Sequence, residues 1–234
     1  ATSTTGGSEV VSTDAGIYAL SEDAFTGYTN GTFSCTGAAD TDISDGNITV
    51  ELGETVVCSV TNTDDAPSLT IEKTITSDNG GTATLDDFNV SVDGTEVAWT
   101  DATSTTGGSE VVSTDAGTYA LSEDAFTGYT NGTFSCTGAA DIDVSDGNIT
   151  VELGETVVCS VTNTDDAPSL TLEKIITSDN SGTATLADFN VSVDGTEVAW
   201  TDTTSTTGGS EVVSTDAGTY ALSEDAFTGY TNGT

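Results

Sequence analysis

Residues 68–76 read Ser-Leu-Thr-Ile-Glu-Lys-Thr-Ile-Thr, with side chains of one kind returning at every second position. A period of two predicts a half-buried β-strand, because successive side chains of a strand point to opposite faces. Leu69 and Ile71 therefore share the apolar face of this strand with Lys73. The strand thus places one ammonium group where the core is expected.

Two later runs each end their apolar face in one polar residue as well. In residues 117–123 this residue is Glu123. In residues 155–164 it is Asn163, and Val157 is expected on the opposite face of that run. Burying a lone ammonium or carboxylate costs several kcal/mol. We therefore expect the lysine, the glutamate and the asparagine to lie together.

The chain of 234 residues repeats itself with a period of 101 residues, since the sequence that starts at Ala1 returns at Ala102 and, with one change, at Thr203. A unit of this length corresponds to one small globular domain rather than to a solenoid repeat. The boundaries are expected at the only two prolines, Pro67 and Pro168. This division predicts the C-terminal part of a repeat in 1–65, a complete repeat in 66–166 and the N-terminal part of a repeat in 167–234.

The complete repeat is rich in threonine and valine, and Asp-Gly, Asn-Gly and Gly-Gly turns separate its apolar runs, whereas helical periodicity is absent. This pattern predicts an all-β fold, and the number of runs suits a two-sheet sandwich. The expected strands are Ser68–Thr76, Ala83–Val92, Thr95–Thr100, Glu110–Thr114, Gly117–Glu123, Thr130–Cys136, Asn148–Leu153 and Glu155–Thr164.

The motifs around the three polar residues resemble those of a known family. They are Lys73 in Leu-Thr-Ile-Glu-Lys, Glu123 in Tyr-Ala-Leu-Ser-Glu, the pair Gly128-Tyr129, and Asn163 in Val-Thr-Asn-Thr. In these motifs the whole repeat is similar to Cna-B-type and SpaA-like domains, which are Ig-like, prealbumin-like β-sandwiches of bacterial surface pilins and adhesin stalks. At one place it departs from them, because Ala-Phe-Thr precedes the Gly-Tyr pair where the family usually has Ala-Pro.

The resemblance implies a spontaneous isopeptide bond between Lys73 and Asn163, assisted by Glu123 as a proton shuttle. The residue types suit this chemistry, because burial favours a neutral amine and a protonated acid. An ordinary buried ion pair beside an amide is the alternative. The other repeats hold partial sets, namely Lys174 with Glu224, whose asparagine would follow residue 234, and Glu22 with Asn62, whose lysine would precede residue 1.

The charge of the chain excludes several functions. Against 39 acidic residues there are two lysines and no arginine or histidine, so the formal charge is −37. Without a basic patch, neither nucleic acid nor an anionic membrane surface is an expected partner. Without histidine, the usual zinc ligands and nucleophilic triads are missing. No apolar run is long enough to span a bilayer, so no membrane insertion is expected.

Both lysines occupy the same phase of the repeat, as expected if their amines are consumed there.

The cysteines and the glycosylation signals also recur in phase. An even number of cysteines in each repeat favours disulfides, with metal binding as the poorer alternative, and disulfides indicate an oxidising compartment. The expected disulfides are Cys35–Cys58 and Cys136–Cys159. Candidate N-glycosylation sites, of which Asn89 and Asn190 are expected to be exposed, are Asn30, Asn47, Asn89, Asn131, Asn148, Asn190 and Asn232.

Aspartates in two equivalent loops have a spacing similar to that of calcium ligands. The loop of the complete repeat contains Asp141, Asp143 and Asp146. It lacks the closing glutamate and the helices of an EF-hand, so a polar turn is the favoured interpretation. No cofactor is expected to be required, and Ca²⁺ or other cations are expected to bind weakly at most.

Together these features predict an extracellular structural protein at the cell surface, a stalk or filament of tandem, internally crosslinked β domains. Its expected partners are copies of itself, and a host or neighbouring-cell surface is a further candidate. No enzymatic activity is expected beyond the autocatalytic crosslink. Two alternatives stay open, namely an adhesin whose repeats bind a glycan or protein directly, and an acidic, cation-dependent surface layer or matrix.

Overall fold

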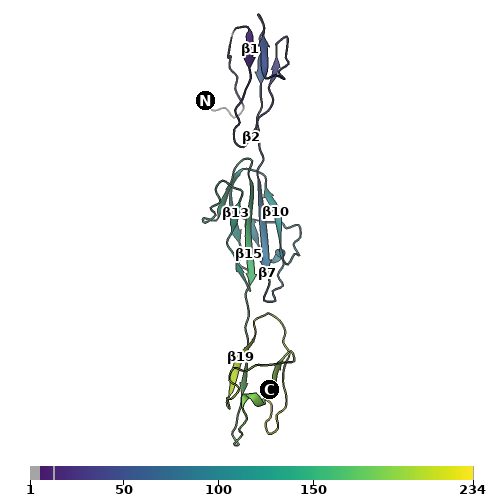
Figure 1. The fold of residues 1–234 in the computed structure, drawn as a ribbon, viewed down its shortest axis with the longest axis vertical. Helices are drawn as coiled ribbons and strands as arrows, with labels where there is room; N and C mark the ends of the chain where they lie inside the picture. The colour runs from purple at the N-terminus through teal and green to yellow at the C-terminus, as the bar shows by residue number, and fades with distance from the viewer. Residues whose placement is uncertain (1–5, 13, 234) are drawn as a thin grey trace.

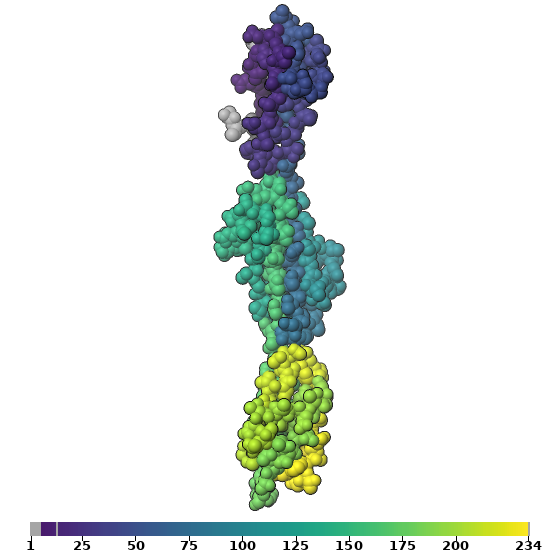
Figure 2. Space-filling view, in the orientation of Figure 1, coloured from purple at the N-terminus to yellow at the C-terminus, as the bar shows by residue number. Residues whose placement is uncertain are grey.

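The computed structural model of the chain describes residues 6–12 and 14–233. Figures 1 and 2 show three units stacked end to end along one axis. Strand pairings join residues within 16–64, within 68–165 and within 170–224. Almost all regular structure is β, as predicted.

The strands follow the repeat of the sequence. The first unit contains β1 (Gly16–Ala19), β2 (Tyr28–Thr29), β3 (Ser34–Thr36), β4 (Asn47–Val50), β5 (Val57–Ser59) and β6 (Thr63–Asp64). The central unit contains β7 (Ser68–Thr76), the 3-10 helix η1 (Leu85–Asp87), β8 (Val90–Val92), β9 (Thr95–Glu96), β10 (Gly107–Ser113), β11 (Gly117–Glu123), β12 (Tyr129–Asn131), β13 (Ser135–Thr137), β14 (Asn148–Val151) and β15 (Thr156–Asp165). The third unit contains β16 (Leu170–Ile175), the 3-10 helix η2 (Leu186–Asp188), β17 (Val191–Val193), β18 (Thr196–Glu197), β19 (Gly208–Ser214) and β20 (Leu222–Glu224).

The central unit has two sheets. One has the order β10-β7-β15-β12, with β13 also paired to β15, and the other has the order β14-β11-β8-β9. β7 and β15, the first and last strands of the unit, run parallel and pair along nine residues, from Ser68 opposite Thr156 to Thr76 opposite Thr164. The other pairings are antiparallel.

The core lies between the inner faces of these sheets. Buried apolar residues from both sheets form it, and the main cluster includes Leu69, Ile71, Val90, Leu121, Ile149, Val157, Cys159 and Val161. Val157 is fully buried on the same face as Cys159 and Val161. The prediction that Val157 lies on the opposite face is therefore wrong, because β15 is uninterrupted and keeps all its odd-numbered side chains on one face.

Two predicted runs are interrupted in the structure, and the runs 95–100, 110–114, 148–153 and 155–164 differ at their ends from β9, β10, β14 and β15. The run 83–92 contains η1 before β8, because the Asp87 carboxylate accepts the backbone N–H of Thr84 at 2.8 Å and closes a short turn. The run 130–136 is divided into β12 and β13 around Gly132, whose N–H donates to the carbonyl of Thr162 at 2.8 Å. Both strands still pair with β15.

The first and central units meet through backbone contacts. The N–H of Gly154, in the central unit, donates to the carbonyl of Asp65 at 2.8 Å. Gly27 of the first unit has φ +80°, and a Cβ built on it would lie 2.6 Å from the Cβ of Leu153. Only glycine fits this approach without movement of its neighbours.

The central and third units also meet through backbone contacts. The N–H of Ala217 donates to the carbonyl of Asn79 at 2.7 Å. A Cβ on the neighbouring Gly80 would lie 2.6 Å from the carbonyl oxygen of Ala217. The 79–80 loop of the central unit thus rests directly on the third unit.

Among the described residues, no helix has the length and apolar character needed to cross a bilayer.

Candidate functional site

Lys73 lies in the interior of the central unit. It projects from β7 on the same face as Leu69 and Ile71, and its side chain has 0% exposure. Burial lowers the pKa of Lys73 below its ordinary value, while the hydrogen bond and charge of Glu123 partly oppose this change. A larger fraction of this amine is therefore neutral than of an exposed lysine at the same pH.

The tight packing of β10 against β7 helps to bury this lysine. Gly108 lies directly opposite Lys73 in the β10–β7 pair. A Cβ at Gly108 would lie 2.6 Å from Cδ1 of Leu85 in η1. Gly108 thus lets η1 close over the sheet beside the lysine, a contact that no pattern in the sequence indicates.

Glu123 reaches the same site from the facing sheet. It is the last residue of β11, its side chain is 3% exposed, and its Oε1 lies 2.5 Å from Nζ of Lys73. The two groups form an ion pair between the sheets. The prediction that these charged residues pair inside the fold is confirmed.

Asn163 is fully buried on the strand next to Lys73. In the parallel β15–β7 pair, Lys73 is opposite Val161 and Asn163 is opposite Ile75, so the lysine and the asparagine are diagonal neighbours on one face. Nδ2 of Asn163 donates to Oδ1 of Asn131 at 3.2 Å. Its Oδ1 is buried and accepts no hydrogen bond from the described residues.

Aromatic rings close one side of the site. Nζ of Lys73 lies 4.7 Å from the centroid of the Phe88 ring. Phe126 and Tyr129 pack edge-on against Phe88, each with a centroid separation of 5.3 Å. Phe126 belongs to the Ala-Phe-Thr segment that departs from the usual family pattern, and here its ring adds to the apolar wall. The apolar wall thus lies beside the buried ion pair.

The partial sets of the other units also come together. Lys174 forms an ion pair with Glu224, and its Nζ lies 4.6 Å from the centroid of the Phe189 ring. In the first unit, Nδ2 of Asn62 donates to Oε1 of Glu22 at 2.8 Å. The grouping inferred from phase within the repeat therefore holds in all three units.

Both predicted disulfides are present, Cys35–Cys58 and Cys136–Cys159. In each case the two cysteines face each other across an antiparallel pair, β3–β5 or β13–β15. The two cysteines of each disulfide are 23 residues apart in the sequence. Closing a loop of this length stabilises a domain by roughly 3 kcal/mol in the chain-entropy model. In the central unit the disulfide fastens the short strand β13 to β15.

The aspartates with calcium-like spacing serve as turn acceptors. The carboxylates of Asp141, Asp143 and Asp146 each accept the backbone N–H two residues later, at 2.9–3.0 Å. Among the described residues, no group of three histidine, cysteine or acidic side chains could hold a metal ion. The geometry is that of successive Asx turns.

The candidate glycosylation sites differ in accessibility. Asn89 and Asn190 are exposed, as predicted. Asn47 and Asn148 cap turns, each through its own backbone N–H and side-chain amide. Asn131 is half-buried and in contact with Asn163. Asn232 is exposed as well, whereas Asn30, Asn47 and Asn148 are half-buried like Asn131.

Asp165 was not recognised from the sequence, although it is 5% exposed at the end of β15. Its carboxylate accepts the backbone N–H groups of Asp78, Asn79 and Gly81 at 2.8–3.0 Å. Burial raises the pKa of Asp165, but these hydrogen bonds outweigh it and lower the pKa below its ordinary value. The loop that it holds is the one that contacts Ala217 of the next unit.

In Asp165→Asn, the free energy of unfolding is expected to fall less steeply with decreasing pH than it does in the wild type. Because its folded-state pKa is lowered, the stability that it contributes is fully present above the unfolded-state value of about 3.9 and disappears as the pH falls through the folded-state value. Urea titrations of the wild type and Asp165→Asn between neutral and acid pH measure the difference. Asp64→Asn, at the equivalent position of the first repeat, is the control. If the free energy of unfolding depended on pH equally in the two variants, this role of Asp165 would be contradicted.

The fold and the site define a class: an all-β chain of tandem two-sheet sandwiches with a lysine and a glutamate paired between the sheets. The family model of the SpaA-type prealbumin-like fold domain matches residues 1–60, 64–161 and 165–234. The chain therefore belongs to this family, and both the predicted fold class and the family resemblance are confirmed. Among curated proteins, none matches the chain.

Proposed function

We propose that the chain is part of an extracellular stalk or filament, in which each complete repeat is fastened by an amide bond between Lys73 and Asn163. One observation carries the proposal. The chain has only two basic residues, and each forms an ion pair with a glutamate, Lys73 in the interior and Lys174 in a partly buried position. In a surface protein of such strong negative charge, these lysines are best explained as reactants.

The proposed reaction is a transamidation. Glu123 takes a proton from Lys73, and the neutral Nζ attacks Cγ of Asn163. The Nζ–Cγ bond forms, and Glu123 returns the proton to Nδ2 of Asn163 and takes the second proton from Nζ. The Cγ–Nδ2 bond then breaks, and this last proton stays on the carboxyl group of Glu123. One molecule of ammonia leaves, and no oxidant or cofactor is needed. The lowered pKa of Lys73 and its burial beside Glu123 support this step.

The position of the bond suits a load-bearing role. The chain enters the central unit at Ser68 on β7 and leaves it at Asp165 on β15. A bond between Lys73 and Asn163 would pass tension directly from the first strand to the last. Residues 74–162 would then carry no load. A mechanical function is the simplest use of a covalent bond at this place.

The contacts between units support a stiff rod. Each junction joins backbone to backbone, through Gly154 and Asp65 at one end of the central unit and through Ala217 and Asn79 at the other. The units stack along a single axis (Figure 2). Near-identical repeats joined in this way suit a spacer, in which length matters more than any single copy.

The location and partners follow from the covalent chemistry and the charge. The two disulfides indicate an oxidising compartment, and the prealbumin-like family is typical of pilins and adhesin stalks. We therefore place the chain outside the cell, with copies of itself as the first partners. Glu123 faces the chain's own lysine, so we propose no reaction on an external substrate.

The mass of the intact chain tests the crosslink. Only the central repeat holds a complete set of lysine, glutamate and asparagine within residues 1–234. After reduction of the disulfides, the mass is expected to be lower than the sequence mass by one ammonia. Glu123→Ala, which removes the proton shuttle, is expected to restore the full mass. A wild-type chain that keeps its ammonia would overturn the proposal.

A further inference from the structure

Asn131 lies beside the nitrogen that leaves in the proposed reaction. It is the last residue of β12 and directly faces Asn163 across the antiparallel β12–β15 pair. Its Oδ1 accepts a hydrogen bond from Nδ2 of Asn163 at 3.2 Å. Its own Nδ2 donates to the backbone carbonyl of Asp124 at 3.1 Å. Asn131 thus connects the turn after Glu123 with the reacting amide.

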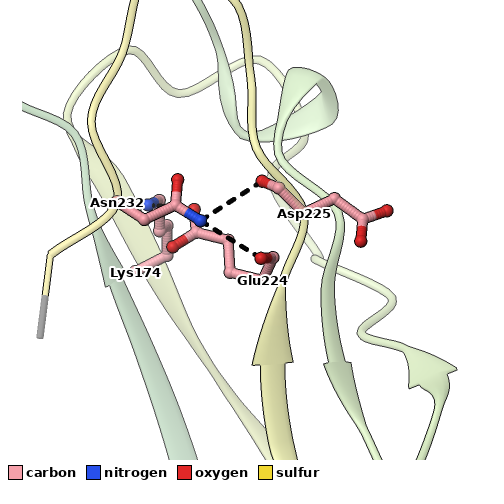
Figure 3. Close-up of polar contacts among 4 residues, drawn as sticks. All are labelled: Lys174, Glu224, Asp225 and Asn232. Carbon is pink, nitrogen blue, oxygen red and sulfur yellow. Dashed lines mark hydrogen bonds and ion pairs between the residues drawn. The ribbon is translucent and has the colours of Figure 1, made fainter.

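The backbone of that turn sets the orientation of this side chain in every repeat. Nδ2 of Asn232 donates to the carbonyl of Glu224 at 3.1 Å and to that of Asp225 at 3.5 Å, beside Lys174 (Figure 3). Nδ2 of Asn30 donates to the equivalent carbonyls of the first unit at 3.4 Å. The amide nitrogen is therefore committed to the backbone, and the oxygen is left to accept another hydrogen bond.

The first unit shows the other arrangement of the asparagine on the last strand. There, Nδ2 of Asn62 donates to the carboxylate of Glu22, and Oδ1 of Asn30 is buried without a partner among the described residues. In the central unit the carboxylate of Glu123 pairs with Lys73 instead, and the amide nitrogen of Asn163 donates to Asn131. The side-chain nitrogen of the asparagine on the last strand therefore has two possible acceptors. One is the carboxylate of the glutamate, and the other is the side-chain oxygen of the asparagine on β12.

We propose that Asn131 is a further residue of the crosslinking reaction, which holds the departing nitrogen of Asn163 before the attack, so that Glu123 pairs with Lys73 until it returns the proton to that nitrogen. This role rests on the proposed function. A fixed acceptor selects one of the two flipped orientations of the amide and leaves the glutamate free to pair with the lysine. As the nitrogen gains a proton and becomes cationic, its hydrogen bond to Oδ1 of Asn131 becomes stronger, so the contact favours the transition state over the ground state.

The rate of ammonia loss tests this role. The full 234-residue chain is made by cell-free synthesis, samples are quenched in acidic denaturant at intervals, and the mass is measured after reduction. Asn131→Ala is expected to slow ammonia loss by roughly tenfold to a hundredfold. Asn131→Asp, which keeps an acceptor oxygen opposite Asn163, is expected to recover most of the rate. In a second aliquot that is left unreduced, formation of the Cys136–Cys159 disulfide reports in each variant that the unit has folded.

Two control variants separate the alternatives. Asn30→Ala removes the same local contacts from the first unit, and Thr133→Ala removes the sequon but keeps Asn131, so both are expected to react at the wild-type rate. Asn131→Ala at the wild-type rate, or Asn131→Asp as slow as Asn131→Ala, would overturn the role of Asn131 and leave the crosslink standing. A wild-type chain that loses no ammonia would reject the crosslink and this role together.

Discussion

Pulled from its two ends with its disulfides reduced, the central repeat is expected to resist extension in the wild type and to unravel in Asn163→Ala. In the crosslinked chain, force passes from β7 through the Lys73–Asn163 amide to the end of β15. In Asn163→Ala the same force must be borne by the hydrogen bonds between these strands. Once they break, the 89 residues from Thr74 to Thr162 are released, which corresponds to roughly 300 Å of extended chain.

Single-molecule force spectroscopy on the 234-residue chain measures this difference. Asn62→Ala is the matched control, since it changes the equivalent asparagine in a unit whose lysine is not part of the chain. That variant is expected to keep the central unit inextensible. The idea is contradicted if the wild type and Asn163→Ala release the same length of chain.

Loss of the crosslink is also expected to cost the central unit much of its thermodynamic stability. The bond closes a loop of 91 residues, from Lys73 to Asn163. By the chain-entropy argument used for disulfides, such a loop stabilises the fold by about 4–5 kcal/mol. For a domain of this size, that corresponds to a fall in Tm of about 20 °C or more in Asn163→Ala. The ion pair of Lys73 with Glu123 remains in this variant, so no buried charge is left alone.

Calorimetry of oxidised samples measures this effect, because the disulfides then constrain both variants equally. Asn62→Ala again provides the reference for loss of an asparagine without loss of a bond. A fall in Tm for Asn163→Ala no larger than that for Asn62→Ala would show that no covalent loop had been opened.

Much of the fold could be predicted because apolar and polar side chains alternate along its strands. The limits of β7 and β11 agree with the predicted runs, and Lys73 and Glu123 lie on the buried faces that parity assigned to them. The disulfides could also be predicted, since two cysteines in each repeat leave one pairing within a domain. These properties depend on spacing of a few residues or on counting within one repeat.

Other features could not be predicted, because they depend on which strands become neighbours. Asn131 resembled a glycosylation site until the β12–β15 pair set it opposite Asn163. Asp165 belongs to none of the motifs of the sequence, but the end of β15 brings its carboxylate into the 78–81 loop. The alternation around η1 was overridden by hydrogen bonds that the backbone N–H and the hydroxyl of Thr84 donate to the carboxylate of Asp87. No local pattern distinguishes these residues from other aspartates and asparagines.

The sequence by itself determined that the chain is a tandem array of β domains and that each domain has a lysine, a glutamate and an asparagine to bury. Periodicity suffices for this, because the face of a side chain depends only on its own strand. The tertiary structure decided the rest, namely the parallel pairing of β7 with β15, the acceptor for the asparagine nitrogen and the contacts between units. These depend on pairing between segments up to about ninety residues apart, and that pairing is selected by the packing of the whole domain.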